Sequence, residues 1–217
     1  MKRKKYEFTG KTRRGFGRIL HQIRALVPLP GVEAGACGGW IEGERNLSHD
    51  GDCWVFGDAS VCDNAQVLDN ALIYDAARVY GNAKVYDGAW VCDHAMVSGD
   101  AWVFGDARVF NYAWIGGDAW AYGDAEISGF AQLCNFARVR KSSHIWVSPP
   151  IGPKNTSITF YRSIDRKIMA VHAFSPDDID AFAREAREMY GNSPSAKACE
   201  KAIRMAKIWI DLTEGGH

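Results

Sequence analysis

The sequence lacks the features that would send a chain into or across a membrane. No run of 18 apolar residues occurs among its 217 residues, so no segment is long enough for a transmembrane helix. The basic start MKRKKYEFTG has the charge of a signal peptide, but the apolar stretch of a signal peptide does not follow it. We therefore expect a protein of the cytoplasm with no membrane partner.

The sequence also lacks the spacings by which most catalytic and metal sites are recognised. Its six cysteines include no Cys-x-x-Cys pair, and we expect them to be reduced thiols, as in an intracellular protein. The chain has no Gly-x-x-x-x-Gly-Lys-Ser/Thr loop, no His-Glu-x-x-His and no Gly-x-Ser-x-Gly. These absences predict no cofactor and no metal ion, and they nominate no enzyme.

The chain has no net charge, because 26 Lys and Arg residues balance 26 Asp and Glu residues. The balance hides an asymmetry, since residues 1–47 carry ten bases and four acids, whereas residues 57–140 carry five bases and eleven acids. A basic head could bind nucleic acid, and an acidic body could mimic its backbone. Both excesses are small, so we do not expect a nucleic-acid partner.

What the sequence has in abundance is a six-residue repeat. Alanine stands at every sixth position from Ala59 to Ala137, fourteen times without a slip, and a second apolar residue, usually Val or Ile, follows two positions later. A hexapeptide period is typical of a parallel β-helix in which each hexad is one short strand and one corner. Residues two apart on a strand share a face, so both columns point into the narrow interior.

The corners of the repeat explain its glycine, aspartate and asparagine content. Gly-Asp, Asp-Asn, Gly-Asn or Asp-Gly precedes most of the alanines, and these residues tolerate positive φ and bond their own backbone in tight turns. We therefore interpret the regular aspartates as turn residues rather than as acid catalysts or metal ligands. Cys53 with Val55, and Ser143 with Ile145, extend the register by one hexad at each end, which makes sixteen hexads.

The two ends of the chain are expected to cover the open ends of the β-helix, since exposed strand edges invite aggregation. We divide the chain into a capping segment at 1–47, the β-helix at 48–148 and a ββαα module at 149–217. In the cap, residues 5–9 and 18–27 fit either a strand or a helix. In the module, residues 157–161 and 168–174 predict a hairpin. Ser175 is expected to cap a helix that Gly191 ends, and Ser193 to cap a second helix.

The repeat resembles that of the hexapeptide-repeat proteins, a class with many acyltransferases. That resemblance implies a left-handed β-helix with triangular coils of three hexads, and hence about five coils here. A closer resemblance covers nearly the whole chain. The Gly-Gly-Trp-Ile-Glu core at 38–42, the Asn-Leu-Ser at 46–48 and the Thr-Phe-Tyr at 159–161 are similar to segments of YdcK-like proteins and of a set of phage and prophage proteins. It implies a phage-encoded protein in a bacterial host, without an established reaction.

The alternative function implied by the wider class is an acyltransferase with a histidine base in an intersubunit active site. His94 is the only histidine among the central hexads, and in coils of eighteen residues it shares a corner with Ala76, Tyr112 and Phe130. A corner that accepts Tyr and Phe does not require a base. No loop interrupts the fourteen hexads, so none could line a binding site for an acyl donor. His94 is therefore the catalytic candidate of the alternative function only, and His144 is no stronger.

Coils of eighteen residues also sort the outward side chains onto three sides, and one side is aromatic at its centre. Six apolar side chains there, at roughly 100 to 150 Å² each, would form a patch of about 700 Å². Stacked rings can stabilise the sheet itself, or the patch can be an interface. For an interface we expect self-association into a dimer or trimer first and a host protein second, in a non-enzymatic protein that inhibits a host defence system. The patch comprises Leu68, Tyr86, Trp102, Phe104, Trp120 and Tyr122.

Overall fold

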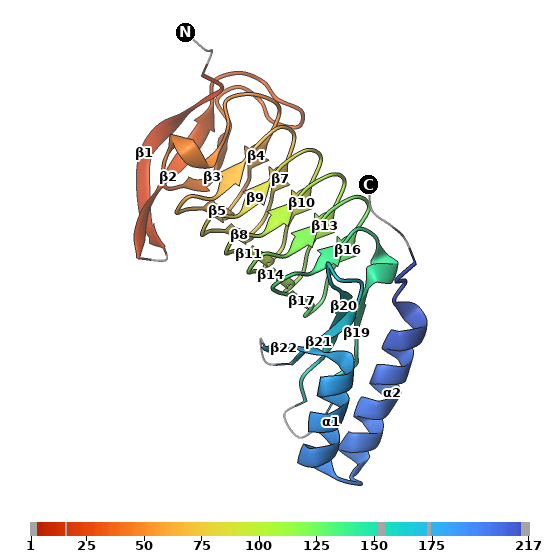
Figure 1. The fold of residues 1–217 in the computed structure, drawn as a ribbon. Coiled ribbons are helices and arrows are strands. Elements are labelled where there is room, and N and C mark those ends of the chain that lie inside the picture. Colours follow the sequence, from red (N-terminus) through yellow and green to blue (C-terminus); the bar gives the residue numbers. More distant parts are fainter. Residues whose placement is uncertain (1–3, 16, 152–154, 173–174, 214–217) are drawn as a thin grey trace.

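The protein is an elongated β-solenoid with a hairpin at one end and a small α/β module at the other (Figure 1). The structure, a computed structural model, describes residues 4–15, 17–151, 155–172 and 175–213. Fifteen two-residue strands follow one another at six-residue intervals. They are β4 (Trp54–Val55), β5 (Ser60–Val61), β6 (Gln66–Val67), β7 (Leu72–Ile73), β8 (Arg78–Val79), β9 (Lys84–Val85), β10 (Trp90–Val91), β11 (Met96–Val97), β12 (Trp102–Val103), β13 (Arg108–Val109), β14 (Trp114–Ile115), β15 (Trp120–Ala121), β16 (Glu126–Ile127), β17 (Gln132–Leu133) and β18 (Arg138–Val139).

These strands stack into three parallel sheets, one on each side of the coil. The orders are β5-β8-β11-β14-β17, β4-β7-β10-β13-β16 and β6-β9-β12-β15-β18, and paired residues are eighteen apart, as in Trp90 and Arg108. The two inward columns are fully enclosed, with Ala95 and Val97, for example, both 0% exposed. The structure therefore confirms the parallel β-helix and the three-hexad coil, and it has about six turns where the sequence predicted about five.

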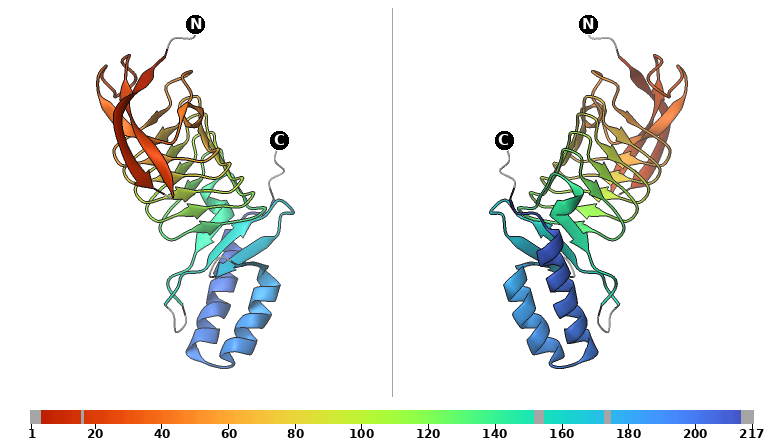
Figure 2. Two further views of the ribbon diagram at one scale, coloured as in Figure 1. Left: turned by 90° about the vertical axis from the view of Figure 1, so that its left-hand side faces the viewer. Right: turned by 90° about the vertical axis from the view of Figure 1, so that its right-hand side faces the viewer.

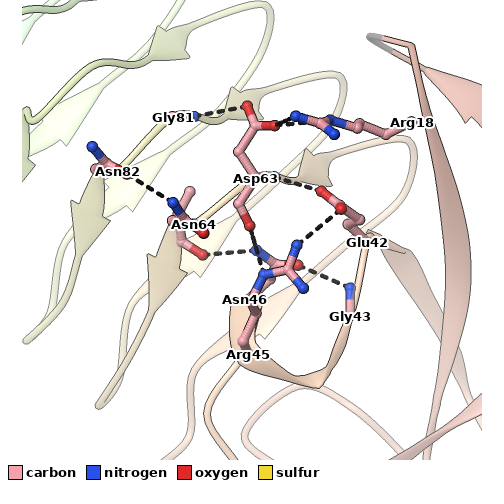
Figure 3. Close-up of polar contacts among 10 residues, drawn as sticks. Arg18, Glu42, Gly43, Arg45, Asn46, Asp63, Asn64, Gly81 and Asn82 are labelled. Atoms are coloured by element: carbon pink, nitrogen blue, oxygen red, sulfur yellow. Dashed lines mark hydrogen bonds and ion pairs between the residues drawn. The ribbon is translucent and has the colours of Figure 1, made fainter.

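The corners agree with the interpretation of the aspartates as turn residues. Asp63, Asp93 and Asn111 have positive φ angles of 57°, 58° and 60°, the left-handed region that glycine occupies at other corners. The side chains of Asp63 and Asp93 also bond the coil that follows. Asn111 N donates to Asp93 Oδ2 at 2.8 Å, and Gly81 N donates to Asp63 Oδ2 at 3.1 Å (Figure 3). Each of these two aspartates thus holds its own turn and the turn one coil further on.

Parallel stacking begins before residue 48, in the segment that the sequence assigned to the cap. β3 (Cys37–Ile41) pairs in parallel with β5, and Ile41 lies opposite Val61, twenty residues on rather than eighteen. Leu47 bridges to Val67 with the same offset, whereas β4 and β7 pair at the usual eighteen. The corner at 48–52 therefore contains two extra residues. This insertion hides the first coil from a strict six-residue count.

The first coil is tied to the second through the backbone of Asp63 (Figure 3). Arg45 and Asn46 lie in the 3₁₀ helix η1 (Glu44–Asn46), and both donate to the Asp63 carbonyl oxygen, from Nε at 2.8 Å and Nδ2 at 3.1 Å. The Glu42 carboxylate accepts the N–H of Asp63 at 2.7 Å and also pairs with Arg45 at 2.8 Å. The irregular first coil is thus held to the second by several side-chain hydrogen bonds in addition to its ladder.

The repeat stops one hexad earlier than predicted at its C-terminal end. Ser143 and Ile145 were expected to continue the parallel ladder, but the chain forms the 3₁₀ helix η2 (Ser142–His144) instead. β19 (Ile145–Val147) then pairs antiparallel with β20 (Thr159–Arg162). The sixteenth hexad therefore does not join the parallel ladder, because its strand, β19, pairs antiparallel with β20 outside the solenoid.

β20 closes the end of the solenoid by bonding to its last coil. The N–H of Gln132 donates to Thr159 Oγ1 at 2.9 Å, and the Tyr161 hydroxyl donates to the carbonyl oxygen of Cys134 at 2.7 Å. Tyr161 is 1% exposed and belongs to the same hydrophobic core as the coils. Burial of this phenol strongly raises its pKa, so it remains a neutral donor. The C-terminal module is therefore continuous, through β20, with the hydrophobic interior of the solenoid.

The N-terminal cap is a β-hairpin of β1 (Tyr6–Gly15) and β2 (Arg18–Ala25). β2 pairs antiparallel with β3, so the hairpin continues one wall of the solenoid beyond its first coil. The apolar spacing at 18–27, which fitted two periods, is that of a strand. Leu20 and Ile23 are buried, whereas Ile19, next to Leu20, is 56% exposed. Pairing with β3 selects the strand, because the apolar pattern of this segment is compatible with both a strand and a helix.

The C-terminal module contains the predicted hairpin and helices, with one additional strand (Figure 2). β21 (Ile168–His172) pairs with β20, and Phe174, at the predicted end of the hairpin, lies outside the described residues. Ser175 does not cap a helix. It starts β22 (Ser175–Asp178), which pairs with β21, and α1 (Ile179–Tyr190) follows with Asp178 as its N-cap. α2 (Pro194–Trp209) begins after Ser193, as predicted. Strand pairing with β21 outweighed the local capping preference of Ser175.

Candidate binding surface

The sheet β6-β9-β12-β15-β18 carries the aromatic residues that the sequence sorted onto one side. Its parallel register places Lys84, Trp102, Trp120 and Arg138 in one row along the solenoid axis. A second row stands two residues further along each hexad. We call both rows together the aromatic face, and its second row comprises Leu68, Tyr86, Phe104, Tyr122 and Arg140.

The rings of the aromatic face stack on one another along the axis. In the second row, Phe104 lies between Tyr86 and Tyr122, with centroid distances of 5.0 and 5.1 Å and interplanar angles of 3° and 12°. In the first row, Trp102 stacks on Trp120 at 5.0 Å and 6°. Edge contacts join the rows, as between Phe104 and Trp120 at 6.0 Å and 75°. The five rings therefore form one connected array.

Cations close both ends of the tryptophan row. Lys84 Nζ lies 5.2 Å from the centroid of Trp102, and the Arg138 guanidinium carbon lies 4.2 Å from that of Trp120. Arg138 also donates to the carbonyl oxygens of Asp118 and Ala137 at 2.7 and 2.8 Å. Burial lowers the pKa of this guanidinium, although the charges of Tyr122 and Asp118 oppose the shift. The tryptophan row thus ends in a cation on each side, of which Arg138 is held in place by two carbonyl oxygens.

This arrangement determines which contacts the face can make. Because the rings stack along the axis, the faces of Phe104, Trp102 and Trp120 contact other rings or the terminal cations, and the ring edges point outward. A sugar or a nucleobase binds aromatic residues by stacking on ring faces, and those faces are already occupied. Stacking also leaves the rings only half-buried rather than exposed, so the open apolar area is smaller than the sequence suggests. What remains is a flat apolar surface suited to another flat surface.

A second aromatic column, at a corner of the solenoid, is more exposed than the aromatic face. His94 stacks on Tyr112 at 5.1 Å, and Tyr112 stacks on Phe130 at 5.4 Å. Tyr112 and Phe130 are 56% and 65% exposed, and Trp90 on the neighbouring sheet is 43% exposed. In the sequence, this corner stands out only through His94, as a catalytic position. The aromatic spacing of eighteen residues was the signal that could have identified it as a column.

The two histidines of the alternative function do not form a catalytic arrangement. The His94 imidazole is exposed and stacked on Tyr112, and it forms no hydrogen bond to another residue that the structure describes. His144 is buried in η2, where its Nδ1 accepts the N–H of Arg140 at 3.2 Å. In the described ranges, no three His, Cys, Asp or Glu side chains converge as a metal site. Neither described helix is long and apolar enough to cross a membrane.

The stacked hexads and the three-sided coil define a parallel β-solenoid protein built from hexapeptide repeats. Residues 77–93, from the middle of the repeat, match the family model described as YdcK Beta solenoid repeat. Together, this match and the solenoid of about six turns support a YdcK-like β-helix family. Comparison with curated proteins gives no match.

Proposed function

We propose that this protein is a non-enzymatic binding protein whose solenoid is a rigid support and whose aromatic face binds a second copy of the chain. The observation that supports this proposal is the connected array of five half-buried rings on one flat sheet, bounded by Lys84 and Arg138. Flat β-sheet faces pack on one another through apolar side chains about 10 Å apart. Two such arrays, each rigid before contact, would lose little side-chain entropy on pairing.

The closed ends of the solenoid favour association through its sides. At the N-terminal end, Tyr6 and Trp54 are 1% exposed and the Tyr6 hydroxyl donates to the Leu47 carbonyl oxygen at 2.9 Å. At the C-terminal end, Tyr161 fills the equivalent place. Both ends are thus covered by the chain itself, and coil-on-coil stacking between molecules would require these caps to leave. Side-to-side contact requires no rearrangement.

Sedimentation velocity across about 10 to 200 µM protein tests this proposal. The wild type is expected to change from monomer to dimer or trimer over that range, and Trp102→Ala/Trp120→Ala to stay monomeric. Leu68→Glu adds a charge to the same face while all five rings remain, so it separates loss of contact from loss of folding. Trp90→Ala, on another sheet, is the matched control and should associate as the wild type does. A wild type that is monomeric throughout the range would disprove self-association.

The foreign partner in this proposal is a host protein of a defence system, which the resemblance to phage proteins suggests. Tagged wild-type protein and Leu68→Glu would be expressed in bacteria and the retained proteins identified. A host protein that is held by the wild type and by Trp90→Ala, but lost with Leu68→Glu, supports that partner. Equal retention by all three variants would exclude the aromatic face as its binding site.

A further inference from the structure

The two helices of the C-terminal module enclose a groove that the aromatic face does not involve. The groove has a volume of about 630 Å³ and lies between α1 and α2. Its walls are mostly charged and its apolar residues include Ile208, which is 73% exposed. The groove is lined by Asp180, Ala183, Arg184, Arg187, Glu200, Ile203, Arg204, Lys207 and Ile208.

The charges of this groove do not balance. Four cationic side chains line it, against the carboxylates of Asp180 and Glu200. Lys207 pairs with Asp180 at 2.8 Å, and Arg187 pairs with Glu200 at 3.6 Å. Arg184 and Arg204 line the same groove from opposite helices, and neither forms an ion pair with a carboxylate of the described chain. Arg184 acts on Asp180 only through its charge, so the N–H donors of both guanidinium groups remain available for a ligand.

The groove is held in shape by contacts at the ends of both helices. α1 begins with the Asp178 carboxylate accepting the N–H of Asp180 at 2.9 Å. α2 is tied to η2 at its far end, where Trp209 Nε1 donates to the Ser142 carbonyl oxygen at 3.3 Å. Just beyond it, Asp211 pairs with Lys141 at 3.0 Å. A ligand would therefore meet a preformed site and would not need to order it.

We propose that this groove binds an acidic segment of a partner polypeptide. Two carboxylates of the segment pair with Arg184 and Arg204, and an apolar side chain between them packs on Ile203 and Ile208. Guanidinium groups bind carboxylates through two parallel hydrogen bonds, which fixes the position of each acid. A nucleic-acid backbone fits less well, because it needs an uninterrupted basic stripe, whereas Asp180 and Glu200 interrupt the cations of this groove. This proposal is independent of self-association through the aromatic face.

Fluorescence anisotropy with a labelled synthetic peptide, Asp-Leu-Asp-Asp-Leu-Leu-Asp, tests the site. The full chain is expected to bind it at 50 mM NaCl and about tenfold more weakly at 300 mM. Arg184→Gln/Arg204→Gln should weaken binding at least about tenfold. Lys197→Gln/Lys201→Gln removes the same charge from exposed positions of α2 outside the groove and should change affinity less than about twofold. Ile208→Ser should weaken binding, whereas Met205→Ser, at a neighbouring exposed position, should not.

Four outcomes would overturn the proposal. The first is no binding of the acidic peptide up to 1 mM. The second is equal binding of a peptide in which Asn replaces every Asp. The third is an equal loss of affinity in the Lys197→Gln/Lys201→Gln control, which would indicate a diffuse charge effect. The fourth is tighter binding of single-stranded DNA of the same net charge. Trp102→Ala/Trp120→Ala should bind the peptide normally, so failure of this site and failure of self-association are distinguishable.

Discussion

The side chain of Lys5 reaches into the first coil of the solenoid, where its Nζ donates to the carbonyl oxygen of Cys53 at 2.8 Å. The same ammonium group donates to the Gly51 carbonyl oxygen at 3.1 Å and lies 3.2 Å from Cys53 Sγ. Lys5 is 3% exposed, although it belongs to the basic head. A positive charge thus satisfies the carbonyl groups that the irregular corner at 48–52 leaves without a ladder partner.

Replacing Lys5 with methionine should destabilise the protein by about 2 to 3 kcal/mol. The methionine keeps most of the volume but leaves buried carbonyl oxygens without the charged donor. The loss is measured by urea unfolding followed by circular dichroism. Lys4→Met is the matched control, because Lys4 forms only an exposed ion pair with Glu44 and should change stability by less than about 1 kcal/mol. Equal effects of the two substitutions would contradict this account of the cap.

Asp93 should tolerate asparagine but not alanine. At φ 58° an alanine is strained by about 1 to 2 kcal/mol, and it also loses the bond from Asn111 N. Asparagine keeps the acceptor and favours the same turn. We therefore expect unfolding free energies about 2 to 3 kcal/mol lower for Asp93→Ala and within about 0.5 kcal/mol of wild type for Asp93→Asn. A large effect of Asp93→Asn would show that the charge, rather than the turn, is what the corner requires.

Phe104 should stabilise the solenoid more than its exposure suggests. It stacks on two rings and meets Trp120 edge-on, so Phe104→Leu removes three aromatic contacts. At about 0.5 to 1.5 kcal/mol for each pair, the expected loss is roughly 1.5 to 4.5 kcal/mol. Phe130→Leu, at the end of the corner column with one stacked neighbour, should cost about 1 kcal/mol or less. Thermal unfolding measures the loss of stability in both variants. A smaller loss for Phe104→Leu than for Phe130→Leu would contradict the stabilising role of the stacked rings.

The protein should lose stability below about pH 6.5 because of His49. Burial, opposed by the carboxylate of Glu44, lowers the pKa of His49, whose ring stacks on Tyr6 at 4.3 Å. The unfolded chain then takes up the proton more readily than the folded one, so this stability is complete above the unfolded pKa and falls as the pH decreases. His49→Gln should show a smaller drop in Tm between pH 7.5 and 5.5 than wild type. His94→Gln should keep the wild-type drop, and the idea fails if both variants behave alike.

Cysteine labelling should distinguish Cys37 from the cysteines of the solenoid. Cys37 is exposed, whereas Cys62 is 1% exposed and burial raises its pKa to about 11. Because the thiolate is the reactive species, iodoacetamide at pH 8 should label Cys37 first and leave Cys62 unlabelled until guanidinium is added. Peptide mapping by mass spectrometry measures both sites. Native labelling of Cys62 at the rate of Cys37 would mean that the coil opens locally.

The fold of the central chain was predictable because its information is local. An alanine and a second apolar residue two positions apart, repeated every six residues, specify which side chains are buried, and Gly, Asp or Asn specifies each corner. Once the coil length was taken as eighteen, the same count placed Trp102 above Trp120 and Tyr86 above Phe104, as the structure confirms. The members of the aromatic face were therefore predictable and their stacking was one of two alternatives, but the extent of their burial was not predictable.

What the sequence by itself determined is the interior of the solenoid, its corners and the membership of its three sides. Only the tertiary structure decided where the coils begin and end. Lys5 donates a hydrogen bond to the first coil and Tyr161 donates one to the last coil, and both acceptors are far away in the sequence. It likewise decided that Ser175 enters a strand and that Arg184 and Arg204 face one groove. A regular period encodes neighbours one coil away, whereas caps and grooves depend on contacts that no local pattern records.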